Sequence, residues 1–174
     1  YIKHPSDVLK VGDVVKVKVL GVDTVMTRES EELAYPAEAK TIAAMKKWDT
    51  RRRVEIAESV DSPVFLSIHQ NIYPSSGPRG SQVLYAQNEP SRVLAELIQS
   101  RLTAALLPEN RRVPVPAGKD IYIMSHVQCT AVLVECGFLS HPQELSLLQS
   151  ADYQKKIASV LTACYLQFTE KGVL

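Results

Sequence analysis

One stretch constrains the fold more than any other: an apolar run, residues 131–134, that closes on Glu135. Gly137 and Pro142 follow it, so the run predicts a buried β-strand that leads through a turn into a helix. In an open α/β sheet, ligands bind just outside the carboxyl ends of the strands, which makes Glu135 a candidate catalytic group. A structural glutamate that caps a helix or forms an ion pair is an equally good interpretation of this stretch alone.

A second stretch has the same design. Residues 64–68 form a mainly apolar run that closes on His69, and polar Gln70 and Asn71 follow. Strands that end in His69 and Glu135 can bring both side chains to one edge of a sheet, and histidine with glutamate is the usual material of a zinc hydrolase. A single histidine at a strand end is more often a structural residue held by hydrogen bonds.

Further short segments follow the same order as the motifs of a known family. These segments are Val25–Arg28, Arg53–Ala57, Ser67–Asn71, Gly80–Tyr85, Leu133–Ser140 and Tyr153–Ala158. Together, residues 24–168 resemble the zinc-dependent N-acetylmuramoyl-L-alanine amidases, which cut the bond between muramic acid and the peptide stem of peptidoglycan. The resemblance implies a three-layer α/β fold, with an open, mainly parallel or mixed sheet flanked by helices and incomplete at its N-terminus.

The resemblance also implies a mechanism and a place of action. His69 would be one ligand of a single zinc ion, and Glu135 would accept the proton of the attacking water and return it to the leaving amine. The expected partner is peptidoglycan, and the expected location is the cell wall or extracellular space. No residue is assigned to substrate binding.

The sequence departs from the family at its start. Amidases of this family begin with a strand that ends in a Gly-His-Gly-Gly-type turn, which supplies the first zinc ligand, and a helical glutamate supplies the second. Neither motif is present in the sequence. Two interpretations follow: a hydrolase whose site other groups complete, or a non-catalytic amidase-fold fragment or fusion product. His126 and His141 flank the Glu135 strand, and we expect both to be structural rather than ligands.

Residues 1–23 differ from the rest of the chain. Their alternating valines and lysines predict one half-exposed strand, and the segment resembles part of an OB-type RNA-binding repeat of a ribosomal protein. An OB barrel needs five strands, so we expect a fragment rather than an independent domain, followed by an amidase-like domain over residues 24–174. A formal net charge of +1 also argues against strong nucleic-acid binding, and RNA binding is the least favoured function.

Composition adds few constraints. The chain of 174 residues has the apolar and charged content of an ordinary globular domain, with no membrane segment and no signal-peptide pattern. Its three cysteines form no zinc-binding pattern, and we expect buried free thiols.

The remaining elements follow from periodicity and turn residues. We predict one long helix or two abutting helices over residues 36–60, and single helices over residues 88–107 and 151–168. Short strands are predicted over residues 82–86 and 120–124. Within the first helix, Asp49 and Arg53 should pair, since they lie one turn apart on one face, whereas Arg51 and Arg52 should be solvated.

Overall fold

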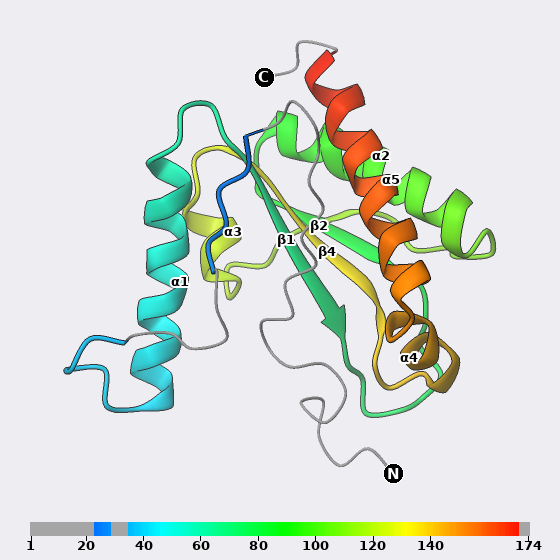
Figure 1. Ribbon diagram of the computed structural model, residues 1–174, viewed down its shortest axis with the longest axis horizontal. Helices are drawn as coiled ribbons and strands as arrows, with labels where there is room; N and C mark the ends of the chain where they lie inside the picture. Colours follow the sequence, from blue (N-terminus) through cyan, green and yellow to red (C-terminus); the bar gives the residue numbers. More distant parts are fainter. Residues whose placement is uncertain (1–22, 29–34, 171–174) are drawn as a thin grey trace.

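The computed structural model describes residues 23–28 and 35–170. These residues form a four-stranded sheet with helices on both faces (Figure 1). The strands are β1 (Val64–Asn71), β2 (Gln82–Tyr85), β3 (Val115–Pro116) and β4 (Thr130–Phe138). The helices are α1 (Ile42–Glu58), α2 (Glu89–Leu106), α3 (Tyr122–His126), α4 (Pro142–Leu148) and α5 (Ala151–Glu170). The predicted α/β sheet flanked by helices is confirmed.

The sheet is mixed, with strand order β1-β4-β2-β3. β1 runs parallel to β4, β4 runs antiparallel to β2, and β2 runs parallel to β3. β4 is therefore internal, and all of its residues except Glu135 are buried. Burial on both faces explains why this strand is a continuous apolar run rather than an alternating one.

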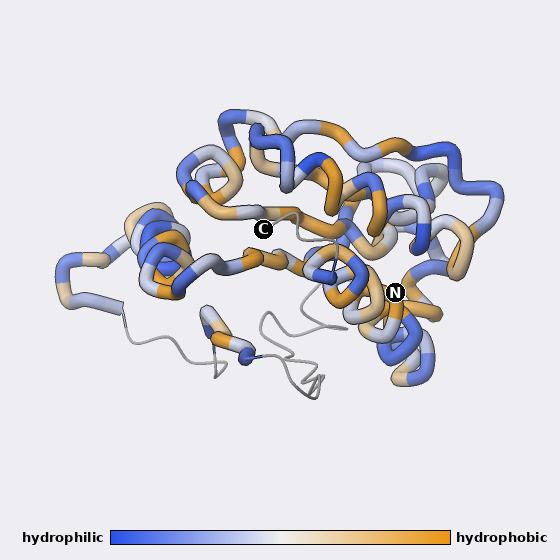
Figure 2. The backbone as a smooth tube through the Cα atoms, turned by 90° about the horizontal axis from the view of Figure 1, so that it is seen from above, coloured by the Kyte–Doolittle hydropathy of each residue, from blue (hydrophilic) through white to orange (hydrophobic). Residues whose placement is uncertain are grey.

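Each face of the sheet has its own core. Val132, Val134 and Cys136 of β4 pack with α2 and α5 on one face. Ala131 and Leu133 pack on the other face, with residues of α1 and α3. Figure 2 shows the helices with both hydrophilic and hydrophobic residues, whereas the central strand segments are mostly hydrophobic. Below, the side that α1 and α3 cover is called the α1 face.

The long helices follow from the sequence periodicity. Asn88 caps α2, with its side chain accepting a hydrogen bond from the backbone of Ser91. The buried stripe of α5 is Ile157, Leu161, Cys164 and Phe168, which includes one of the cysteines predicted to be buried. All three cysteines are free, although Cys129 is only half-buried.

Several sequence-based boundaries are wrong. The segment over residues 120–124 is not a strand, because its apolar side chains belong instead to the short helix α3, where His126 stacks on Tyr122 one turn earlier. Helix α1 begins at Ile42 rather than near Pro36, because Thr41 takes an extended conformation and caps it. Val25–Arg28 resembles the end of a family strand but is not a strand here.

Two further predictions can be compared only with the residues that the structure describes. Residues 1–22 lie outside them, so the OB-type fragment stays a prediction. Within the described part of the chain, every helix is too short or too polar to cross a bilayer.

Candidate active site

His69 and Glu135 lie opposite each other on neighbouring strands. They are Cα partners in the parallel register of β1 with β4, and Glu135 is also the Cα partner of Gln82 in the antiparallel register of β4 with β2. Paired residues on adjacent strands project to the same side of a sheet. The three side chains therefore form one row across the α1 face, which we call the 69–135–82 row.

Glu135 sits within its strand rather than at the end. β4 continues to Phe138, so the expectation that the strand closes on this carboxylate is wrong, although the predicted juxtaposition with His69 is correct. The Oε2 atom of Glu135 is buried and has no hydrogen-bond partner among the described residues. Desolvation by burial raises the pKa of this carboxyl above its ordinary value of 4.5.

His69 occupies the more exposed end of the row. Its Nε2 atom lies 2.8 Å from Oγ of Ser67, a buried residue two positions earlier on the same face of β1. Partial burial lowers the pKa of the imidazole below 6.5, and the positive charge of Arg53 lowers it further. The ring is therefore neutral at pH 7, which is the form that binds metal ions.

Arg53 belongs to a charged cluster next to the row. It donates from Nε to Oδ2 of Asp49 at 3.1 Å, and Nη2 of Arg28 donates to the same oxygen at 3.1 Å. The predicted pairing of Asp49 with Arg53 is confirmed, and Arg51 and Arg52 are exposed as expected. Two guanidinium groups share one carboxylate, so the cluster places excess positive charge beside His69.

The two other histidines that the structure describes have structural contacts. His141 is the N-cap of α4, where its Nδ1 accepts from the backbone of Glu144 at 3.4 Å. Nδ1 of His126 lies 2.8 Å from the carbonyl oxygen of Tyr122. Both contacts agree with the expected structural roles. Among residues 23–28 and 35–170, no group of three or more histidine, cysteine, aspartate or glutamate side chains is arranged to hold a metal ion.

The sequence does not point to Gln82, which is the Cα partner of Glu135, or to Arg112, which contacts Gln82. The side-chain amide of Gln82 is fixed by two hydrogen bonds: Nη1 of Arg112 donates to its Oε1 at 3.0 Å, and its Nε2 donates to the carbonyl of Val113 at 3.2 Å. Gln82 lies in a short strand and Arg112 in a loop. The sequence around such polar residues does not show which strand will lie next to them. The register of β2 with β4 brings Gln82 next to Glu135, and Arg112 joins the site through its hydrogen bond to Gln82.

A model of the N-acetylmuramoyl-L-alanine amidase family matches residues 9–164. The chain belongs to this family. The amidase match begins inside residues 1–23, where the structure describes only Asp23, so the domain boundary predicted near residue 24 remains a prediction.

Relatives of this amidase-family chain are found among characterised proteins. The germination-specific N-acetylmuramoyl-L-alanine amidase of Bacillus subtilis is 36% identical over 157 residues, which cover 87% of this chain and 64% of that protein. The amidase LytC of the same species is 35% identical over 117 residues, which cover 66% of this chain and 23% of LytC. The chain thus spans less than two thirds of either relative.

Solved structures show the same fold. The CwlD amidase from Clostridioides difficile, solved in complex with the GerS lipoprotein, superposes with a TM-score of 0.78 at 30% identity, over 84% of this chain and 75% of that chain. The amidase Ami1 from Mycobacterium smegmatis superposes with a TM-score of 0.69 at 24% identity, over 87% of this chain and 68% of that chain. The second likeness concerns the amidase fold alone.

Proposed function

We propose that this chain is a peptidoglycan amidase that hydrolyses the amide between muramic acid and the first residue, L-alanine, of the peptide stem. The observation that carries the proposal is the position of Glu135, whose buried Oε2 lacks a partner among the described residues and lies in one row with His69. Family membership supports the reaction and the substrate class. The substrate would place the action of the chain at the cell wall.

Glu135 is proposed as the general base and then the general acid. Its carboxylate would accept a proton from the water that attacks the amide carbonyl, and the resulting carboxylic acid would return that proton to the leaving amine. A raised pKa suits both steps, because proton transfer is most effective when the pKa of the group lies near the working pH.

Zinc is the cofactor that the family resemblance implies, and His69 is its proposed ligand. The described residues fit only part of such a site, since among them there is no cluster of three potential ligands. Structural and catalytic zinc sites take at least three protein ligands. Further ligands would have to come from outside the described residues, and we derive no chemical step through the metal.

The partial ligand set among the residues that the structure describes favours a second candidate function. A chain with one imidazole ligand binds zinc weakly, and the protein would then be a non-catalytic member of the amidase family. Such a protein keeps the fold and the 69–135–82 row without turning over the substrate.

Zinc content and hydrolysis, measured on the same protein sample, separate the two candidates. After dialysis against zinc, the amidase proposal expects bound metal and the release from purified peptidoglycan of peptides that begin with alanine. A chelator should abolish the release, and added zinc should restore it. A folded protein with near-zero zinc and no peptide release would instead establish the non-catalytic candidate.

A further inference from the structure

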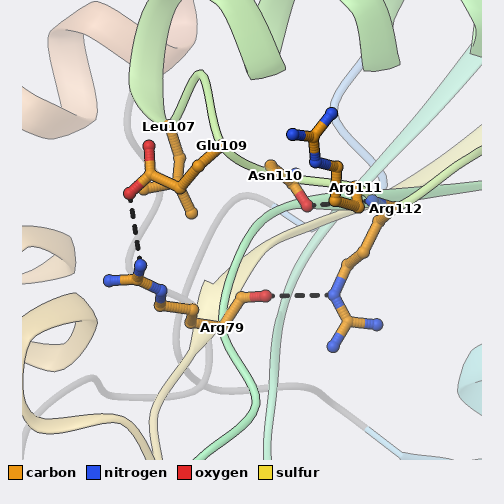
Figure 3. A pocket seen from close by; sticks show the side chains of 6 residues that line it. All are labelled: Arg79, Leu107, Glu109, Asn110, Arg111 and Arg112. Carbon is orange, nitrogen blue, oxygen red and sulfur yellow. Dashed lines mark hydrogen bonds and ion pairs between the residues drawn. The ribbon is translucent and has the colours of Figure 1, made fainter.

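An arginine-rich pocket of about 360 Å³ includes Arg112, which donates a hydrogen bond to Gln82 of the 69–135–82 row. Figure 3 shows the side chains that line it. They are Arg79, Leu107, Glu109, Asn110, Arg111 and Arg112. Three guanidinium groups and a single carboxylate give this pocket an excess of positive charge, which favours an anionic ligand.

The arginines differ in how they are held. Nη2 of Arg79 pairs with Oε1 of Glu109 at 3.2 Å, and Nε of Arg112 donates to the carbonyl oxygen of Arg79 at 3.1 Å (Figure 3). Arg112 also stacks on the ring of Phe138, with its Cζ atom 4.7 Å from the ring centroid. Arg111 is exposed, and its side chain makes no hydrogen bond or ion pair with any residue that the structure describes.

The pocket wall is anchored to the start of β2. Nδ2 of Asn110 donates to the carbonyl of Ser81 at 2.8 Å, and Oδ1 of Asn110 accepts from the backbone of Arg112 at 3.1 Å. The close approach of Asn110 depends on Gly80, because a Cβ atom there would lie 2.6 Å from Oδ1 of Asn110. The backbone N–H of Gly80 is held in turn by the buried carboxylate of Glu144 at 2.8 Å. The arginines are therefore presented on a preformed wall.

Gln82 connects this pocket to the proposed catalytic glutamate. It is the Cα partner of Glu135, and its Oε1 accepts the hydrogen bond from Nη1 of Arg112. The pocket thus lies one strand away from Glu135, on the side opposite to His69. A substrate whose reacting amide faces Glu135 would extend its neighbouring groups either over His69 or over Arg112.

We propose that this pocket binds a carboxylate of the substrate's peptide stem, an inference that rests on the proposed amidase function. A peptide stem ends in a carboxylate, and guanidinium groups bind planar carboxylates through paired, charge-assisted hydrogen bonds. Arg111 has no described partner for any of its guanidinium donors, and Arg112 connects the pocket to Gln82 beside Glu135. The pocket would thereby orient the peptide side of the scissile amide.

The test compares two synthetic N-acetylmuramoyl peptides that begin with L-alanine, one ending in a carboxylate and one in a carboxamide. Calorimetry should show that the carboxylate form binds about tenfold more tightly, since one charge-assisted interaction is worth about 1.4 kcal/mol or more. Arg111→Gln should abolish most of this difference. Arg101→Gln is the matched control and should retain it, because Arg101 is an exposed arginine of α2 that does not line the pocket.

Binding and hydrolysis together keep the two proposals distinguishable. Equal affinity for both peptides, or an unchanged ratio in Arg111→Gln, would overturn the pocket proposal even if both peptides are hydrolysed. Preferential binding of the carboxylate form without hydrolysis of either peptide would support the pocket and contradict the amidase function. Absence of binding by both peptides would overturn the pocket proposal.

Discussion

At the scale of single residues, the desolvated carboxyl of Glu135 makes stability depend on pH. Its pKa is raised in the folded state, so just above pH 4.5 the folded chain keeps a proton that the unfolded chain has lost. The free energy of unfolding should therefore fall as pH rises through this window, because the charged carboxylate is buried without a partner among the described residues. A neutral glutamine at position 135 removes the free-energy cost of burying this charge.

We therefore expect Glu135→Gln to be at least as stable as the parent chain at pH 7, with the difference shrinking toward pH 4. Urea unfolding across this pH range, in metal-free buffer, measures the effect. Glu38→Gln is the control, since Glu38 is exposed. A Glu135→Gln protein that is less stable than the parent by the same amount at every pH would contradict the burial argument.

His69 should give the opposite pH dependence. Its pKa is lowered in the folded state, so protonation favours the unfolded chain, and stability present above pH 6.5 is lost as pH falls toward the lowered pKa. His69→Gln should flatten the dependence of the unfolding free energy on pH just below pH 6.5. The same loss of stability in parent and variant over that interval would show that His69 does not cause it.

The backbone conformation of Gly80 disfavours any residue with a side chain at this position. Its φ of +93° is strained for any residue with a Cβ atom, and an added Cβ would collide with Asn110. Gly80→Ala should lower the free energy of unfolding by about 1–3 kcal/mol. Gly77→Ala is the matched control, because a Cβ atom at Gly77 meets nothing within 4 Å. Equal effects of the two substitutions would refute this account.

One side of the site is predictable from the sequence, and the other is not. The pairing of His69 with Glu135 was predictable, because two apolar runs that each lead to a polar residue favour adjacent parallel strands. Gln82 was not predictable, because its position depends on an antiparallel register that polar residues in a short strand do not specify. Arg112 lies in a loop and joins the site only through its hydrogen bond to Gln82.

At the scale of elements, α5 stabilises the sheet through one buried stripe. Leu161 lies in the core that β4 shares with α2, whereas Leu166 of the same helix is 38% exposed. Leu161→Ala should lower the free energy of unfolding by about 2–5 kcal/mol, since it leaves a cavity. Leu166→Ala should cost much less. Chemical denaturation checks both, and similar losses would contradict the assigned packing.

Long elements were predicted better than short ones. Helices α2 and α5 follow from apolar residues at helical spacing over many turns. The helix α3 was mistaken for a strand because Ile121, Tyr122 and Ile123 are residue types that favour strands. In the structure Tyr122 stacks on His126 and Met124 is buried, so tertiary contacts outweigh the local preference.

At the scale of the whole molecule, β1 lies at one edge of the described sheet and exposes apolar side chains. Leu66 and Ile68 point away from the α1 face, and they are 39% and 56% exposed. Apolar residues on an edge strand promote association between chains. Ile68→Thr should therefore reduce concentration-dependent self-association in sedimentation velocity experiments.

Val113→Thr is the control for Ile68→Thr. Val113 is 64% exposed but lies in the loop before β3 rather than on the sheet edge. Val113→Thr should leave self-association unchanged, because the substitution alters exposed apolar surface away from the edge. Equal reductions by both substitutions would show that total apolar exposure, rather than the strand edge, causes association.

The most direct test of the molecule's function compares the parent chain with Glu135→Gln. The measured quantity is the rate at which zinc-supplemented protein releases peptides with an N-terminal alanine from peptidoglycan. We expect the parent to release peptide and Glu135→Gln to lose about 10²–10⁴-fold in rate, with an unchanged circular dichroism spectrum and unfolding midpoint at or above that of the parent. The exposed control Glu38→Gln should keep the parental rate. A Glu135→Gln protein that releases peptide as fast as the parent would contradict the proposed role of Glu135.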